Sequence, residues 1–161
     1  MSAALWIMRH GEAAPGSPDA QRELTAHGRE EVARMADWLA STLDGSQHGE
    51  LRVAVSPYRR ARQTAEIVAE RLDRPVEVLE RFTPNDPLEP VVDWLQGNAA
   101  STPWLLIGHM PLVGALSACL VDGDPRASLP MPTAAIAALE ADVWAAGCAR
   151  LVAFRHPADL I

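Results

Sequence analysis

The sequence predicts an α/β protein, a three-layer α/β/α sandwich in which helices cover both faces of a mostly parallel sheet. Short apolar segments alternate along the chain with segments of helical periodicity, the pattern of strand–helix–strand units. The length of 161 residues is typical of one domain, so we expect a single domain over residues 1–161. Apolar residues make up 48%, which is enough for a buried core, and their runs are far shorter than the ~20 residues of a membrane span.

The elements of the first half of the chain are predicted from apolar runs and the turn residues that flank them. A short apolar run indicates a buried strand, whereas apolar residues that recur every three or four positions indicate a helix. Glycine and proline mark loops, and Thr25 and Pro57 are residue types that suit the start of a helix. In order, we expect a strand at Leu5–Met8, a loop over 11–23, a helix from Thr25 to about Leu43, a loop at Gly45–Gly49, a strand at Leu51–Val55 and a helix from Pro57 to Leu72.

The second half continues the alternation and ends in two strands. Three prolines interrupt the chain after its third strand and predict a loop there, and Gly147 predicts a turn between the closing strands. In order, we expect a strand at Val76–Leu79, a loop containing Pro84, Pro87 and Pro90, a short helix near Val91–Gln96, a strand at Trp104–Ile107, a helix from Pro111 to about Leu120, and strands at Ala134–Leu139 and Ala149–Phe154.

The charged residues exclude several classes of function. The chain has 14 basic and 21 acidic residues, a net charge of −7, which disfavours general binding to nucleic acid or to an anionic membrane. All the basic residues are arginines, so P-loop and Schiff-base lysine chemistry are excluded. The two cysteines, Cys119 and Cys148, form no CxxC pair, which argues against a zinc cluster or a disulfide framework. Residues 1–8 lack the basic cluster of a signal peptide, so we expect a cytoplasmic protein.

Polar residues follow three of the predicted strands at the point where each strand ends. They are Arg9-His10-Gly11, the segment from Ser56 to Arg60, and Gly108-His109. Ligands of parallel α/β sheets bind at the carboxyl ends of the strands, so these side chains are expected to converge. A neutral imidazole is a good nucleophile toward phosphorus, and guanidinium groups suit the charge that spreads over three phosphoryl oxygens. The sequence therefore indicates phosphoryl chemistry at this edge.

The same segments resemble the motifs of a known family. Arg9-His10-Gly11-Glu12 is similar to the signature of the histidine phosphatase superfamily, which includes the phosphoglycerate mutases; the segment from Ser56 to Thr64 resembles its second motif, and Gly108-His109 its third. The small size and the segment from Gly108 to Val113 most closely resemble SixA-type protein phosphohistidine phosphatases. The resemblance implies a phosphoglycerate-mutase-like fold, a phosphohistidine intermediate at His10, phosphate contacts from Arg9, Arg60 and His109, and no metal or other cofactor.

Helical periodicity separates the two neighbouring arginines of the second motif. Arg59 shares a helical face with polar residues, and Arg60 lies at the edge of the apolar face. The polar set is Gln63, Glu66, Glu70 and Asp73, and the neighbours of Arg60 are Thr64, Ile67 and Val68. We therefore expect Arg60 to point toward the sheet edge, and Arg59 and Arg62 to point to solvent.

The acid that would protonate a leaving alkoxide is less clearly predicted. Glu80 and Asp86 follow the third strand and are candidates, Glu80 the stronger one, although a structural role is equally compatible with either context. Glu12 is predicted either to hydrogen-bond near its loop or to lie in solvent. The remaining histidines, His27, His48 and His156, are expected at the surface.

The predicted function is therefore a metal-independent phosphatase acting on phosphohistidine in a protein or on another phosphorylated substrate. The alternatives are a phosphatase for small phosphate esters, a phosphate-binding module without turnover, a mutase, and a metallohydrolase that uses His10, His109 and a carboxylate. Neighbouring arginines would repel a divalent cation, which disfavours the last of these. No nucleic-acid or membrane partner is expected, and the oligomeric state is left open.

Overall fold

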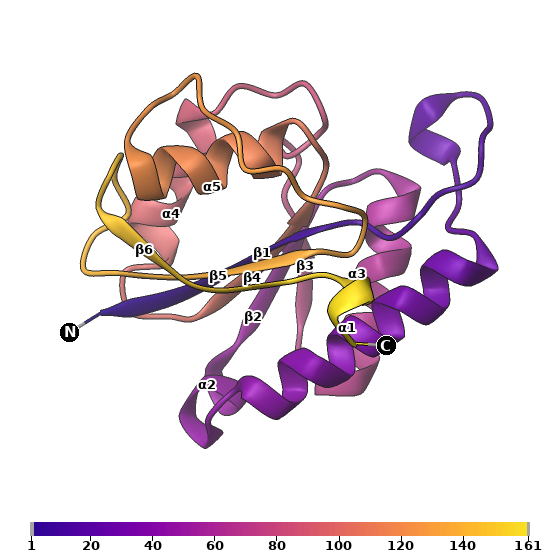
Figure 1. Cartoon of the computed structure of the whole chain (residues 1–161), viewed down its shortest axis with the longest axis horizontal. Coiled ribbons are helices and arrows are strands. Elements are labelled where there is room, and N and C mark those ends of the chain that lie inside the picture. The colour runs from indigo at the N-terminus through magenta and orange to yellow at the C-terminus, as the bar shows by residue number, and fades with distance from the viewer. Residues whose placement is uncertain (1, 161) are drawn as a thin grey trace.

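A computed structural model describes residues 2–160 and contains one six-stranded sheet (Figure 1). The strands lie in the order β3-β2-β4-β1-β5-β6. Their bounds are β1 Ala3–Arg9, β2 Arg52–Val55, β3 Val76–Val78, β4 Trp104–Gly108, β5 Ile136–Ala141 and β6 Ala149–Arg155. Only β5 runs antiparallel to its neighbours β1 and β6, so the prediction of a mostly parallel sheet is confirmed.

Helices cover both faces of this sheet (Figure 1). The α-helices are α1 Ala26–Thr42, α2 Gly45–Glu50, α3 Arg59–Leu72, α4 Glu89–Asn98 and α5 Leu112–Asp122, and two short 3₁₀ helices are η1 Asp19–Gln21 and η2 Pro157–Leu160. None of the helices within residues 2–160 has the length and apolar character needed to cross a membrane.

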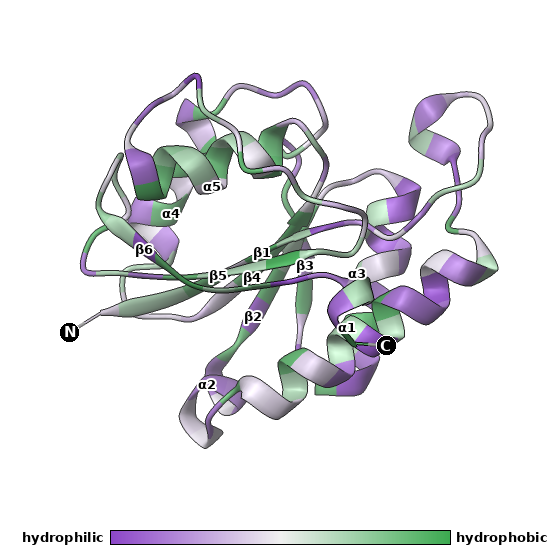
Figure 2. Ribbon diagram, in the orientation of Figure 1, coloured by the Kyte–Doolittle hydropathy of each residue, from purple (hydrophilic) through white to green (hydrophobic). Residues whose placement is uncertain are grey.

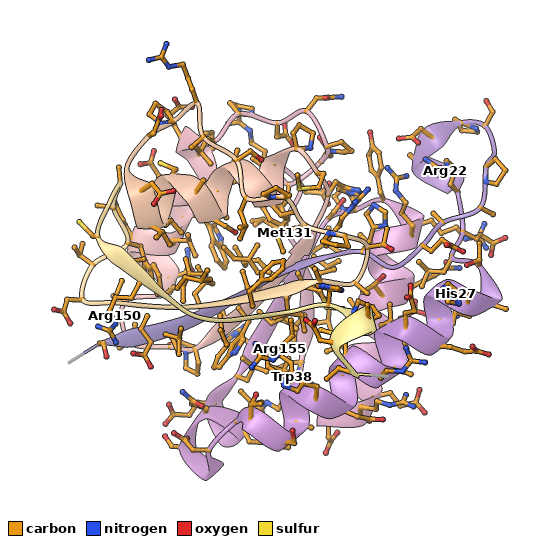
Figure 3. All side chains as sticks on the ribbon, viewed as in Figure 1. Arg22, His27, Trp38, Met131, Arg150 and Arg155 are labelled. Atoms are coloured by element: carbon orange, nitrogen blue, oxygen red, sulfur yellow. The ribbon has the colours of Figure 1, made fainter. Side chains whose placement is uncertain are left out.

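Alternate residues of β1 belong to two separate cores, one on each face of the sheet. Leu5 and Ile7 pack with apolar residues of α4 and α5, whereas Trp6 and Met8 pack with those of α1 and α3. This alternation follows from the two-residue period of a strand. Apolar residues line the strands and the inward faces of the helices (Figure 2), and side chains fill the space between the layers (Figure 3). The predicted three-layer α/β/α sandwich is therefore confirmed.

The prediction of a loop at Gly45–Gly49 is wrong, because this segment forms α2. Asp44 caps the helix by accepting a hydrogen bond from the Gln47 backbone N–H at 2.7 Å, and the Gln47 side chain accepts one from the Asp44 backbone N–H at 3.1 Å. This reciprocal capping box offsets the low helix propensity of the two glycines. His48 is half-buried rather than a simple surface residue, since its Nε2 lies 2.9 Å from the carbonyl oxygen of Leu72.

Smaller corrections concern where elements begin. Pro57 precedes α3 instead of opening it, because Tyr58 is the N-cap and Arg59 the first helical residue. β5 begins at Ile136 and not at Ala134, whose φ of 65° lies outside the extended region. The predicted loop over 11–23 contains the 3₁₀ turn η1.

Candidate active site

The ends of β1, β2 and β4 bring three predicted motifs together. Arg9 pairs with Gly108 in the parallel register of β1 and β4, and the His10 backbone N–H donates to the Gly108 carbonyl oxygen at 2.9 Å. The Ser56 N–H at the end of β2 donates to the Ile107 carbonyl oxygen at 3.1 Å. The imidazole rings of the two candidate histidines, His10 and His109, consequently lie with their centroids 5.1 Å apart.

His10 is held with one ring nitrogen toward the backbone and the other toward Arg60. Its Nδ1 lies 2.7 Å from the carbonyl oxygen of Gly11. A carbonyl oxygen can only accept, so Nδ1 carries the proton and Nε2 keeps its lone pair. That lone pair accepts a hydrogen bond of 3.3 Å from Nε of Arg60. The Gly11 N–H donates to Oγ1 of Thr64 at 3.1 Å, which fixes the carbonyl that orients the ring.

Arg60 points into the site and Arg59 points away from it, as helical periodicity predicts. Arg60 is 4% exposed, whereas the Arg59 side chain is 45% exposed and forms an ion pair with Glu23 at 3.3 Å. The same periodicity misplaces Gln63, which is buried rather than solvent-facing. The Gln63 Oε1 accepts a hydrogen bond of 2.8 Å from the backbone N–H of Leu24 and so ties α3 to the loop before α1.

His109 is buried and its orientation depends on Ser56. The two side chains meet through His109 Nε2 and Ser56 Oγ at 2.7 Å, and Ser56 Oγ also accepts from the Tyr58 backbone N–H at 3.1 Å. When the Ser56 hydroxyl donates to Nε2, its oxygen accepts from Tyr58, and the proton of neutral His109 lies on Nδ1. This Nδ1 is buried and has no partner within residues 2–160.

Arg9 presents a second buried nitrogen without a partner. Its Nη1 donates to the carbonyl oxygen of Met131 at 2.9 Å, which anchors the half-buried side chain, but Nε has no hydrogen-bond partner among the described residues. A buried N–H group needs an acceptor, so Arg9 Nε, and His109 Nδ1 in the tautomer that carries its proton there, are suited to bind an oxyanion.

Burial and positive charge keep both imidazoles neutral. Burial, together with the charges of Arg60 and Arg9, lowers the pKa of His10 to about 4, although its hydrogen bond to Gly11 acts in the opposite direction. Burial, reinforced by His10 and Arg60, lowers the pKa of His109 to about 3. At neutral pH Nε2 of His10 is therefore unprotonated, which is the state that attack on phosphorus requires.

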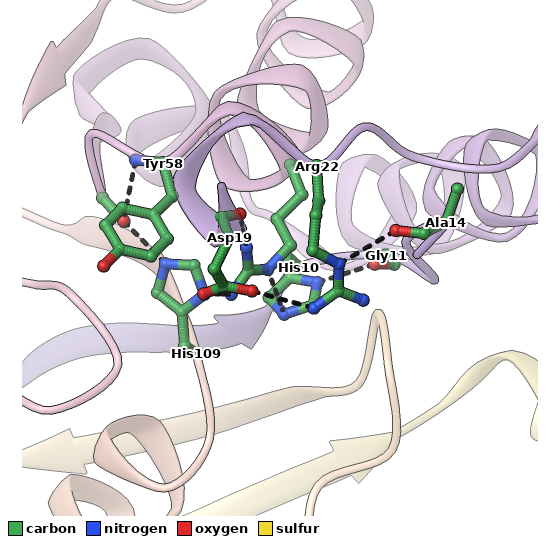
Figure 4. A network of polar contacts seen from close by, with 9 residues as sticks. His10, Gly11, Ala14, Asp19, Arg22, Tyr58 and His109 are labelled. Carbon is green, nitrogen blue, oxygen red and sulfur yellow. Dashed lines mark hydrogen bonds and ion pairs between the residues drawn. The ribbon is translucent and has the colours of Figure 1, made fainter. Parts of the chain in front are cut away.

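Two residues of the site were not predicted from the sequence. Asp19 accepts hydrogen bonds from Nη1 of Arg22 at 3.0 Å and from Nη2 of Arg60 at 3.2 Å, so its carboxylate joins the two arginines beside His10 (Figure 4). Both residues lie in the loop over 11–23, which has no periodicity from which a side-chain direction could be predicted. The hydrogen bonds from Arg22 and Arg60 lower the pKa of Asp19, so it is ionised at neutral pH.

Within the described part of the chain, no hydrogen bond or ion pair joins either carboxyl group proposed as a leaving-group acid to His10, His109, Arg9 or Arg60. Glu80 is exposed and lines a surface hollow with Leu79, Arg81 and Trp94. Asp86 accepts two hydrogen bonds from Thr83, at 2.8 Å from the backbone N–H and 2.7 Å from the hydroxyl, and so stabilises a turn.

Glu12 also has a local structural contact. Its Oε1 accepts a hydrogen bond of 2.8 Å from the Thr25 hydroxyl, which in turn caps α1 by accepting from the Gly28 N–H at 2.8 Å. Gly28 lies so close that a Cβ there would come within 2.2 Å of the Glu12 carbonyl oxygen. Of the alternatives for Glu12, the structure therefore favours hydrogen bonding near its loop.

The metallohydrolase alternative gains no support from the geometry. Between residues 2 and 160, no group of three or more histidine, cysteine or carboxylate side chains is arranged to hold a metal ion. Arg60 instead occupies the position next to Nε2 of His10.

Comparison with known proteins identifies the family of this chain. Residues 5–84 match the family model of the histidine phosphatase superfamily (branch 1). Phosphohistidine phosphatase SixA from Escherichia coli (strain K12) is 40% identical over 144 residues, a match that covers 86% of this chain and 85% of that protein. The chain belongs to the histidine phosphatase superfamily. The resemblance seen in the motifs is thereby confirmed, and this member of the superfamily is a phosphatase acting on phosphorylated substrates.

Solved structures of other phosphatases have the same fold. The protein histidine phosphatase SixA complexed with tungstate superimposes with a TM-score of 0.85 at 35% identity, over 98% of this chain and 99% of that chain. A mycobacterial glucosyl-3-phosphoglycerate phosphatase has a TM-score of 0.67 at 19% identity, over 94% of this chain and 98% of that chain. At this identity the similarity concerns the fold only.

We expect NMR of the ring nitrogens to find His10 and His109 neutral from pH 7 down to about pH 5, because their pKa values lie at about 4 and about 3. Each ring should carry its proton on Nδ1, because Gly11 accepts from His10 Nδ1 and Ser56 donates to His109 Nε2. Ser56→Ala removes the donor to His109 Nε2, so this variant should lose the Nδ1–H preference of His109 and retain that of His10. Ser117→Ala, which removes another buried hydroxyl, is the control. Identical His109 spectra in wild type and Ser56→Ala would contradict the assignment.

Proposed function

We propose that this histidine phosphatase removes the phosphoryl group from phosphohistidine in a protein and that His10 carries the group in a covalent intermediate. The observation that carries the proposal is the fixed orientation of His10: Nδ1 donates to Gly11, and the unprotonated Nε2 faces Arg60. The names of similar proteins support the substrate class, since the relative from Escherichia coli is a phosphohistidine phosphatase.

The first step exchanges one phosphorus–nitrogen bond for another. The Nε2 lone pair of His10 attacks phosphorus, and the electron pair of the breaking P–N bond returns to the substrate ring. The other nitrogen of that ring carries a proton taken from solvent, so the ring leaves as neutral imidazole. The ring of His10 becomes positively charged as it is phosphorylated, and the Gly11 carbonyl oxygen, 2.7 Å from Nδ1, stabilises this charge. In the second step water attacks the same phosphorus, releases inorganic phosphate and regenerates neutral His10.

Fixed donors would bind the three equatorial oxygens of the transferring phosphoryl group. Arg9 Nε and His109 Nδ1 are buried, and no described residue accepts a hydrogen bond from either of them. Arg60 lies directly against the nucleophilic nitrogen, 3.3 Å away. Such preorganised donors stabilise the charge that develops in the transition state, and two guanidinium groups supply it without a metal ion.

The position of the acidic residues favours a phosphorus–nitrogen bond over an alkyl ester. A phosphate ester releases a poor alkoxide leaving group unless an acid protonates the oxygen, whereas imidazole leaves more readily. Glu80 is exposed, and Asp86 accepts two hydrogen bonds from Thr83. Asp86 is engaged in that turn, and no hydrogen bond of Glu80 to a residue of the site supports a role in the protonation that an ester requires.

The covalent intermediate can be trapped with a radiolabelled phosphohistidine protein. Wild type should acquire a label that is lost in acid and stable in base, as expected for a phosphoramidate, and His10→Ala should acquire none. His27→Ala is the matched control, because His27 is exposed and pairs with Glu31 on α1. Turnover by His10→Ala at the wild-type rate would rule out this mechanism.

The two arginines at the start of α3 should differ in importance. Arg60→Ala removes a transition-state donor and should lower kcat/KM by about 10²–10³-fold, or about 3–4 kcal/mol. Arg59→Ala removes a solvent-exposed charge, so we expect a small effect that diminishes at high salt. The measurement is kcat/KM for both variants at two ionic strengths, and equal losses would show that Arg60 has no special role.

A comparison of substrates tests the leaving-group argument. The enzyme should have a higher kcat/KM on a phosphohistidine substrate than on an alkyl phosphate, because only the latter needs an acid. Glu80→Gln should leave both values unchanged, since Glu80 is exposed and lines a surface hollow with Leu79, Arg81 and Trp94. A preference for the alkyl phosphate that disappears in Glu80→Gln would instead identify Glu80 as the general acid.

A further inference from the structure

The carboxylate of Asp19 contacts Arg60 at the position where a phosphoryl group would bind. Nε and Nη2 of Arg60 form one edge of the guanidinium group; Nε donates to His10 Nε2 at 3.3 Å, and Nη2 lies 3.2 Å from Asp19 Oδ2. A phosphoryl group next to Nε2 of His10 would take its donors from this edge. Asp19 therefore already accepts a hydrogen bond from Nη2, one of the two nitrogens of this edge.

Two further contacts strengthen the hold of Asp19 on the site. Its backbone carbonyl oxygen accepts from Nη1 of Arg60 at 2.8 Å, and Oδ1 accepts from Nη1 of Arg22 at 3.0 Å. The buried Arg60 guanidinium thus has an acceptor at each of its three nitrogens without any phosphate. A carboxylate that joins two guanidinium groups makes the same kind of hydrogen bonds to them as a phosphate group would.

The segment that carries Asp19 is tied at its base and exposed at its tip. A bridge between Ala13 and Leu24 and a hydrogen bond of 2.8 Å from the Ala14 N–H to the Glu23 carbonyl oxygen close the base. Residues 15–19 beyond it are exposed, and η1 stands out from the body of the molecule in Figure 1, the purple turn at the upper right. Moving Asp19 away from Arg60 therefore exposes no core residue of this segment.

We propose that the Asp19 carboxylate is a built-in competitor for the phosphate pocket: it neutralises Arg60 in the free enzyme, is displaced by the phosphoryl group of the substrate, and returns to expel product phosphate. The inference rests on the proposed function, because it assigns the pocket to a phosphoryl group. Like charges on one guanidinium edge repel, so the carboxylate lowers the affinity for any oxyanion there.

Titration calorimetry with inorganic phosphate tests this competition without turnover. Asp19→Ala and Asp19→Asn both remove the charge, and each should bind phosphate at least about tenfold more tightly than wild type. Asp37→Ala is the matched control, because it makes the same change in net charge. Exposed Asp37 on α1 forms an ion pair of 2.9 Å with Arg71 in the last turn of α3, so this variant should bind phosphate as wild type does. The Asp19 variants should also show a lower KM for a phosphohistidine substrate.

The results that would contradict the competition differ from those that would contradict the proposed function. Unchanged or weaker phosphate binding by both Asp19 variants would overturn the competition, and so would a large fall in kcat at unchanged phosphate affinity, which would make Asp19 an acid–base catalyst instead. Failure of the proposed function would look different: wild type would not turn over phosphohistidine, while the Asp19 variants would still bind phosphate more tightly.

Discussion

The parallel register between β1 and β4 is the constraint on which the site depends. Arg9 pairs with Gly108, so the next residue of each strand, His10 and His109, leaves the sheet at the same edge, and the two rings lie 5.1 Å apart. A shift of one residue would move one histidine to the other face of the sheet. Gly108 contributes by its size, because a Cβ there would come within 2.5 Å of the Phe82 ring.

That placement puts two imidazoles among arginines in a buried site, and the charges have two consequences. Burial and the neighbouring guanidinium groups act in the same direction on His10 and lower its pKa to about 4, which keeps the nucleophile unprotonated. The same guanidinium groups attract an anion, and in the free protein that anion is the carboxylate of Asp19. The same positive charges thus keep His10 unprotonated and attract the phosphoryl group that His10 attacks.

The sequence was sufficient to predict the strand ends and the direction of Arg60, because both depend on short-range periodicity. It was not sufficient for Asp19 and Arg22, since the conformation of an irregular loop depends on tertiary contacts such as those to Arg60. Gln63 was misplaced for a related reason: periodicity identifies a polar side chain as outward-facing, but this one is buried by its hydrogen bond to the Leu24 backbone N–H. Glu80 was proposed on its position after a strand, and the structure shows this side chain exposed, so a role as the acid stays a prediction.

The distribution of donors around His10 separates ground-state binding from transition-state stabilisation. Interactions that bind substrate and transition state equally lower KM without raising kcat. Asp19 opposes the binding of any oxyanion at the edge of Arg60 that it contacts, including product phosphate. Nδ1 of His109 and Nε of Arg9 have no acceptor among the described residues, so no protein group competes with a phosphoryl group for them. An internal carboxylate can thus weaken the affinity of an arginine-rich pocket for phosphate in the free enzyme, while leaving free the donors that contact the phosphoryl oxygens during transfer.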